Sequence, residues 1–268
     1  MAKTVAHRGA SADAPENTLA AFRLAWDEGA DGIEGDFMLT ADGQIVCFHD
    51  PDTRRLAGER LVVKKTPLER LRQLDIGKWK GERWAGERIA TLSEVLETVP
   101  AGKYVVIELK DGPEIVAPFG KVLAAADVAS SSILVISLVD ETIAECRRRL
   151  PELKCHWLSG YKRDEVGNWR PTAEEVIESV KRLEAAGFGS MSLPEHFDAA
   201  FVAQLRAAGI DEFHVWTVDD PEVYTRPWKV VSPLTRETDY QIYEYGCHEG
   251  NLAVGNILRG GRAVENQQ

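Results

Sequence analysis

The chain has 268 residues, with 43 Asp and Glu against 32 Lys and Arg, so its formal net charge is −11. A hydrophobic content of 44% with 28% charged residues excludes a disordered chain and a membrane protein. The acidic excess argues against a surface that binds nucleic acid or anionic lipid, and it is compatible with the binding of divalent cations.

Neither the cysteines nor the N-terminus indicates a secreted protein. Cys47, Cys146, Cys155 and Cys247 are scattered and form no Cys-x-x-Cys pair, so we expect neither a disulfide framework nor a zinc site. No apolar run reaches the length that a signal peptide or a membrane helix needs. These features predict a cytoplasmic protein without stable membrane insertion.

Short β-branched runs alternate with amphipathic helical stretches from residue 4 to about residue 219. The predicted strands are Thr4–Arg8, Gly32–Leu39, Ile45–His49, Tyr104–Lys110, Ile133–Leu138, Lys154–Leu158, Gly189–Leu193 and Phe213–Val218. Only Thr40–Gln44 separates the second and third strands, and its Ala-Asp-Gly predicts a hairpin. Elsewhere the alternation predicts a parallel α/β sheet. A TIM-type (β/α)8 barrel is favoured, and an open doubly wound sheet is the alternative.

Residues 51–90 form the most polar internal stretch, and we interpret them as an insertion into the α/β pattern. They contain eleven Lys or Arg residues together with Trp79 and Trp84. One interpretation is a solvated surface loop with one short helix, which is the favoured one. The other is a cap over one edge of a functional site, with aromatic and basic side chains that face a phosphorylated ligand.

Alternation along the strands places several ionisable side chains on the face opposite the helices. Glu34 and Asp36 share the inward face of one predicted strand, and Glu108 shares the inward face of another with Lys110. Unpaired carboxylates would be costly there, so a positive group must meet them. The complete set of such residues at strand ends or on inward faces is His7, Arg8, Glu34, Asp36, His49, Glu108 and Lys110.

The residue types in this set restrict the chemistry. Carboxylates without cysteine suit Mg²⁺ or Ca²⁺, and Arg8 with Lys110 offers fixed positive charge for a phosphate. His7 and His49 can exchange a proton near neutral pH. Each motif alone could be structural, since a buried ion pair is poor evidence of function. Metal-assisted cleavage of a phosphoester uses every group in the set, whereas hydride or acyl transfer uses few.

Six motifs together resemble those of the glycerophosphodiester phosphodiesterases over about residues 4–223. They are His7-Arg8-Gly9, Pro15-Glu16-Asn17-Thr18, Glu34-x-Asp36, His49-Asp50, Glu108-Leu109-Lys110 and Trp216-Thr217-Val218. The resemblance implies a (β/α)8 barrel with an insertion after the His-Asp motif. It also implies hydrolysis of glycerophosphodiesters, such as glycerophosphocholine or glycerophosphoethanolamine, to sn-glycerol 3-phosphate and an alcohol, with a divalent cation.

The resemblance also assigns roles to single residues. It implies that Glu34, Asp36 and Glu108 are metal ligands, that His7 and His49 are an acid/base pair, and that Arg8 and Lys110 contact the phosphate. Trp216 would form an apolar wall beside the glycerol, and Glu16 and Asn17 would order the first loop. For these last three residues, simple packing is an equally good interpretation.

The chain departs from the family pattern in two places. Gly35 stands where a larger apolar residue is expected, which predicts looser outward packing of that strand. After Val223 the family continues through a helix and a last strand, but here only Lys229–Ser232 could fill the eighth strand position. We therefore predict a barrel domain over residues 1–223 and an atypical segment, 224–268, that would cover the open edge within one molecule or between two copies.

Two other functions compete with the phosphodiesterase. A related phospholipase D acting on lysophospholipid or sphingomyelin would use a similar pair of histidines and carboxylate site, but the absence of secretion features argues against it. An inactive barrel that serves as a binding or structural protein would follow if incomplete closure disturbed the site, because a displacement of about 1 Å can cost on the order of 100-fold in rate.

Overall fold

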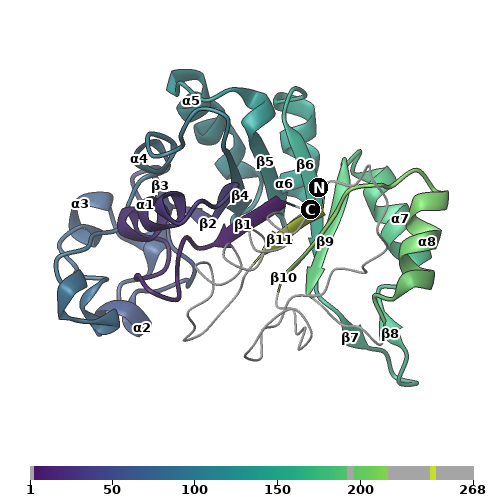
Figure 1. Ribbon diagram of the computed structural model, residues 1–268, viewed down its shortest axis with the longest axis horizontal. Coiled ribbons are helices and arrows are strands. Elements are labelled where there is room, and N and C mark those ends of the chain that lie inside the picture. The colour runs from purple at the N-terminus through teal and green to yellow at the C-terminus, as the bar shows by residue number, and fades with distance from the viewer. Residues whose placement is uncertain (1–2, 192–195, 217–241, 246–268) are drawn as a thin grey trace, which may run out of the picture.

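The computed structural model describes residues 3–191, 196–216 and 242–245 (Figure 1). Its main sheet has nine strands, all parallel except the antiparallel β3 (Ile45–Cys47). The parallel strands are β1 (Lys3–His7), β2 (Gly32–Leu39), β4 (Tyr104–Leu109), β5 (Ile133–Ser137), β6 (Lys154–Ser159), β9 (Gly187–Met191), β10 (Phe213–Trp216) and β11 (Ile242–Tyr245). Because β1 pairs with β2 on one side and with β11 on the other, the sheet closes into the predicted barrel.

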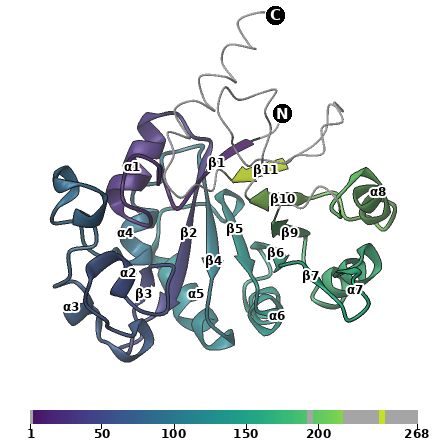
Figure 2. The ribbon, with the colours of Figure 1, turned by 90° about the horizontal axis from the view of Figure 1, so that it is seen from below.

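The helices lie outside this ring of strands, as Figure 2 shows. They are α1 (Leu19–Asp27), α4 (Leu92–Leu96), α5 (Val116–Ala125), α6 (Asp140–Arg149), α7 (Ala173–Arg182) and α8 (Ala199–Ala207). Short 3-10 turns at Pro113–Ile115 and Ser130–Ser132 and a hairpin of β7 (Lys162–Arg163) and β8 (Trp169–Arg170) complete this part. Within the described ranges, no helix is both long and apolar enough to cross a membrane.

Alternation along the strands divides the core into two layers. The outward residues Ile33, Phe37 and Ile107 are fully buried against the helices. A smaller inner cluster fills the barrel, formed by Val5, Tyr104, Val106, Leu134, Ile136 and Leu158. Glu34 and Asp36 have the opposite parity to Ile33 and Phe37, so they face the interior, as the alternation predicts.

The insertion after β3 is a folded unit and not a solvated loop. It contains α2 (Arg54–Ala57) and α3 (Leu68–Leu71), with 3-10 turns at Val63–Lys65, Lys78–Lys80 and Glu82–Trp84. It has a core to which the insertion contributes Leu56, Val63, Leu71, Leu74, Ile76 and Ile89, and which Met38 of β2, Val46 of β3 and Phe48 complete. The favoured interpretation of residues 51–90 was therefore wrong, because apolar residues scattered without a clear period between the charges converge in one core.

The predicted looseness at Gly35 is also wrong. A Cβ atom there would lie 3.1 Å from both the Phe22 ring and the Cys47 thiol. These two neighbours occupy the space that a larger side chain at residue 35 would fill. The glycine therefore fits the close approach of α1 and β3 to β2.

The eighth strand position is filled by β11, Ile242–Tyr245, and not by a run before residue 235. His214 of β10 aligns with Tyr243, and Thr4 of β1 aligns with Glu244. The earlier candidate, Lys229–Ser232, lies outside the described residues. Closure was missed because β11 is only four residues long, and its Ile-Tyr-Glu-Tyr follows a connection with no helical pattern.

Candidate active site

The His7-Arg8-Gly9 motif forms a tight turn directly after β1. Arg8 has φ +57° and Gly9 has φ +78°, a region that favours glycine. A Cβ atom on Gly9 would lie 2.6 Å from the carbonyl carbon of Ala21, so the first turn of α1 also excludes a side chain. The turn directs the Arg8 side chain back over the neighbouring strand, toward Asp36.

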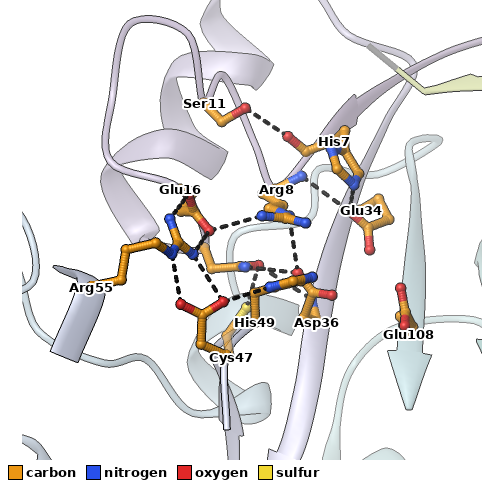
Figure 3. A network of polar contacts seen from close by, with 12 residues as sticks. His7, Arg8, Ser11, Glu16, Glu34, Asp36, Cys47, His49, Arg55 and Glu108 are labelled. Carbon is orange, nitrogen blue, oxygen red and sulfur yellow. Dashed lines mark hydrogen bonds and ion pairs between the residues drawn. The ribbon is translucent and has the colours of Figure 1, made fainter. Parts of the chain in front are cut away.

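Three carboxylates gather inside the barrel wall. Glu34 and Asp36 project from β2 and Glu108 from β4, and one oxygen from each lies within 4.8 Å of the other two (Figure 3). Glu34 and Asp36 are each only 1% exposed. Among the described residues, no hydrogen-bond partner meets the buried Oε1 of Glu34. Three carboxylates, one of which has an oxygen without a hydrogen-bond partner among the described residues, fit a hard divalent cation such as Mg²⁺ or Ca²⁺.

The electrostatics of this cluster point the same way. Burial and the charges of Asp36 and Glu108 raise the pKa of Glu34 well above its ordinary value. Burial and Asp36 likewise raise the pKa of Glu108. Burial alone would raise the pKa of Asp36 too, but Lys110 and Arg8 outweigh it and lower that pKa. Without further positive charge the site therefore favours protonation of some carboxylates, and a bound cation would remove that tendency.

Two fixed cations border the carboxylates. Lys110 Nζ lies 3.1 Å from both Asp36 and Glu108. Arg8 Nε lies 3.3 Å from Asp36 Oδ2, and the Arg8 backbone N–H donates to Glu34 Oε2 at 3.0 Å. The structure therefore brings Arg8 and Lys110 to the carboxylate cluster, at the position from which both could meet an anionic ligand.

The two histidines stand in different surroundings. His7 Nε2 lies 3.8 Å from Glu34 Oε2, and burial together with Arg8 lowers the pKa of His7 to about 3. His49 Nδ1 lies 2.8 Å from Asp50 Oδ1. Burial would raise the pKa of Asp50, but hydrogen bonds from Arg55 and His49 outweigh it and lower the pKa. An ionised Asp50 can only accept a hydrogen bond, so Nδ1–H of His49 is the donor.

The remaining residues near the site differ in whether the sequence pointed to them. Asn17 Nδ2 donates to Asp36 Oδ2 at 2.9 Å, and its Oδ1 accepts from the Asp36 backbone N–H at 3.2 Å. Asn17 was a candidate because of its motif. No sequence motif pointed to Arg55, because contacts between residues that are distant in the sequence leave no local pattern. Trp216 ends β10, and its side chain lies outside the described part of the structure.

The comparison with protein families decides the affiliation of the chain. The family described as "Glycerophosphoryl diester phosphodiesterase family" matches residues 7–248. The chain belongs to this family. The match extends past β11, and therefore beyond the end near residue 223 that the motifs predict.

Curated members of the family align with part of the chain. A glycerophosphodiester phosphodiesterase of Caldanaerobacter subterraneus subsp. tengcongensis is 48% identical over 109 residues, which is 40% of this chain and 45% of the relative. A glycerophosphodiester phosphodiesterase of Bacillus altitudinis is 39% identical over 113 residues, covering 41% and 46%. The chain thus spans less than half the length of these relatives in the alignments.

Solved structures align over almost the whole chain. An Oleispira antarctica phosphodiesterase, determined in complex with the product sn-glycerol-3-phosphate, has a TM-score of 0.76 at 26% identity, with 98% of this chain and 96% of that one covered. A glycerophosphodiester phosphodiesterase of Thermotoga maritima has a TM-score of 0.69 at 24% identity, with 97% and 98% covered. The second likeness concerns the fold alone.

Proposed function

We propose that the chain hydrolyses glycerophosphodiesters, such as glycerophosphocholine and glycerophosphoethanolamine, to sn-glycerol 3-phosphate and an alcohol. One observation carries the proposal: the carboxylate triad of Glu34, Asp36 and Glu108 adjoins two cationic side chains at the carboxyl-end side of the barrel. Barrel enzymes have their active sites at that end. The product bound in the Oleispira antarctica neighbour supports the substrate class.

In this proposal Glu34, Asp36 and Glu108 hold Mg²⁺ or Ca²⁺. The unmet Oε1 of Glu34 and the all-oxygen donor set support the assignment. When bound, the divalent cation supplies Lewis-acid neutralisation of the phosphate charge. Arg8 and Lys110 would contact phosphate oxygens through charge-assisted hydrogen bonds.

His7 and His49 act as the acid/base pair. One imidazole accepts the proton of the glycerol 2-hydroxyl as that oxygen attacks phosphorus, and the other gives a proton to the departing alcohol. A water molecule then opens the cyclic phosphate with the two roles exchanged. Asp50 orients His49, and Trp216 forms an apolar wall beside the glycerol. A cytoplasmic location and self-association through residues 224–268 stay predictions.

Product identity tests the function against its nearest alternative. Incubation with glycerophosphocholine should release sn-glycerol 3-phosphate and choline, whereas lysophosphatidylcholine and sphingomyelin should remain largely uncleaved. Preferential cleavage of the two lipids would instead favour a phospholipase D. Binding of Mg²⁺ or Ca²⁺ without turnover of any of the three substrates would favour a binding or structural barrel.

The variant His49→Ala tests the acid/base assignment. We expect kcat to fall by about 100-fold or more, the typical contribution of general acid–base catalysis, with unchanged metal binding. His49 side chain exposure is 34%, so its truncation should leave the melting temperature nearly unchanged. Full metal-dependent turnover in this variant would remove His49 from the acid/base pair.

A further inference from the structure

Arg55 belongs to the insertion, yet its guanidinium group contacts an acid in each of the segments that follow His7 and His49. Its Nη1 and Nη2 donate to the two oxygens of Glu16, each at 2.8 Å. Its Nε donates to Asp50 Oδ2 at 2.6 Å, and Nη2 lies 3.2 Å from Asp50 Oδ1. Figure 3 shows the Arg55 side chain reaching toward Glu16 from outside the barrel.

Each of these two acids also holds a residue of the site. Glu16 accepts from Arg8 Nη1 at 3.0 Å, and Asp50 accepts from His49 Nδ1 at 2.8 Å. The contacts therefore form one continuous series of hydrogen bonds between side chains. Its members, in order, are Arg8, Glu16, Arg55, Asp50 and His49.

We propose that Arg55 is a positioning residue, which fixes Arg8 and His49 relative to each other through Glu16 and Asp50. The inference rests on the proposed function. A planar guanidinium with a fixed fork can bind both oxygens of Glu16 and still reach Asp50, whereas a lysine ammonium cannot hold both acids in one geometry. The series of contacts links Arg8, the proposed phosphate contact, to His49, one of the two proposed proton-transfer groups.

The insertion fixes Arg55 in place. The next residue, Leu56, is 4% exposed and packs in the insertion core. Just before the helix, the fully buried Thr53 donates its hydroxyl hydrogen to the Glu59 carbonyl at 2.7 Å. Rigid support of this kind is what a site needs to keep its geometry within a fraction of an ångström. The cap interpretation of residues 51–90 thereby gains a specific role through one side chain.

Arg60 supplies the matched control. It lies in the same insertion and pairs with Asp52 at 2.7 Å, but it is 56% exposed and does not reach the site. We expect Arg55→Ala to lower kcat for glycerophosphocholine by roughly 10–100-fold, since misalignment of about 1 Å has that effect, and Arg55→Lys to recover part of the loss. Arg60→Ala should leave kcat unchanged, and the melting temperatures of the Ala variants should be similar.

Double-mutant cycles separate positioning from general destabilisation. Once Arg55 is alanine, Asp50→Asn should lower kcat by a much smaller factor than it does in the native chain, because both changes break the same chain of contacts. An Arg55→Ala variant with the kcat of Arg60→Ala, or fully multiplicative effects of the two substitutions, would overturn the proposal.

A readout that needs no turnover keeps this proposal distinct from the proposed function. The ¹⁵N resonances of the His49 ring report whether Nδ1–H is held by Asp50. In Arg55→Ala these resonances should shift or broaden, while Arg60→Ala should match the native spectrum. Absence of turnover in the native chain would refute the proposed function, whereas an unchanged His49 spectrum in Arg55→Ala would refute the positioning role.

Discussion

At the scale of single residues, the site depends on backbone conformations that few side chains allow. Gly9 and Gly43 both have positive φ, at +78° and +76°, but they differ in their surroundings. Nothing lies within 4 Å of a Cβ atom built on Gly43, whereas one on Gly9 would collide with Ala21. This pair therefore separates backbone strain from steric collision.

We predict that Gly9→Ala destabilises the fold by about 2–4 kcal/mol, the sum of left-handed strain and overpacking. Gly43→Ala should cost only about 1–2 kcal/mol, because strain alone applies. The free energy of unfolding in urea measures both. Equal costs for the two variants would contradict the close approach of α1 to the turn after β1.

Another residue-scale feature is a polar network around the half-buried Glu212, which directly precedes β10. Glu212 accepts from Lys154 Nζ at 2.6 Å and lies 3.1 Å from His156 Nε2. Burial alone would raise the pKa of Glu212, but hydrogen bonds from His156 and Lys154 outweigh it and lower the pKa to about 2. An ionised Glu212 can only accept hydrogen bonds, so Nε2–H of His156 is the donor in this pair. The Nδ1 atom of His156 then accepts a hydrogen bond from His214 Nδ1 at 3.1 Å.

This network predicts a pH dependence of stability. The folded pKa of Glu212 is depressed, so its contribution is complete above the unfolded value of about 4.5 and is lost as the pH falls toward about 2. Glu212→Gln should cost ~2 kcal/mol at pH 7, and the difference should shrink below pH 4.5. Urea unfolding at several pH values measures it, with the exposed Glu152→Gln as control. A difference that grows on acidification would refute the network.

At the scale of elements, local signals explain which ones the sequence could predict. Strands such as β4 and β5 have contiguous apolar and β-branched residues, and their ends agree with the prediction within a residue. Capping boxes, another local signal, begin α4 at Thr91 and α7 at Thr172. The insertion core and the contacts of Arg55 depend on pairing between distant residues, so no local pattern could reveal them.

The closing strand β11 gives an element-scale prediction. It pairs with β1 on one side and β10 on the other, so proline at residue 243 would remove a backbone donor from a strand without a free edge. Tyr243→Pro should lower the melting temperature strongly, by the equivalent of about 3 kcal/mol or more. Tyr243→Ala, which keeps the backbone N–H, should cost less. Equal melting temperatures for the two variants would show that β11 does not close the barrel.

At the scale of the whole molecule, the sequence predicted the site better than it predicted closure. Glu34, Asp36 and Glu108 are brought together by strand alternation and by the pairing of neighbouring strands, in which Asp36 aligns with Glu108. Both features are encoded over a few residues. Closure requires β1 and β11 to meet from opposite ends of the chain, and nothing in either short segment specifies the other. The proposed metal-dependent reaction depends on both the assembled site and the closed barrel.

The most direct test is turnover of glycerophosphocholine before and after metal removal. The native chain should lose sn-glycerol 3-phosphate release in a chelator and regain it with Mg²⁺ or Ca²⁺. Asp36→Asn should not regain it, because this carboxylate lies at the centre of the carboxylate and cation contacts. Full turnover of the native chain in excess chelator, or full recovery in Asp36→Asn, would contradict the account.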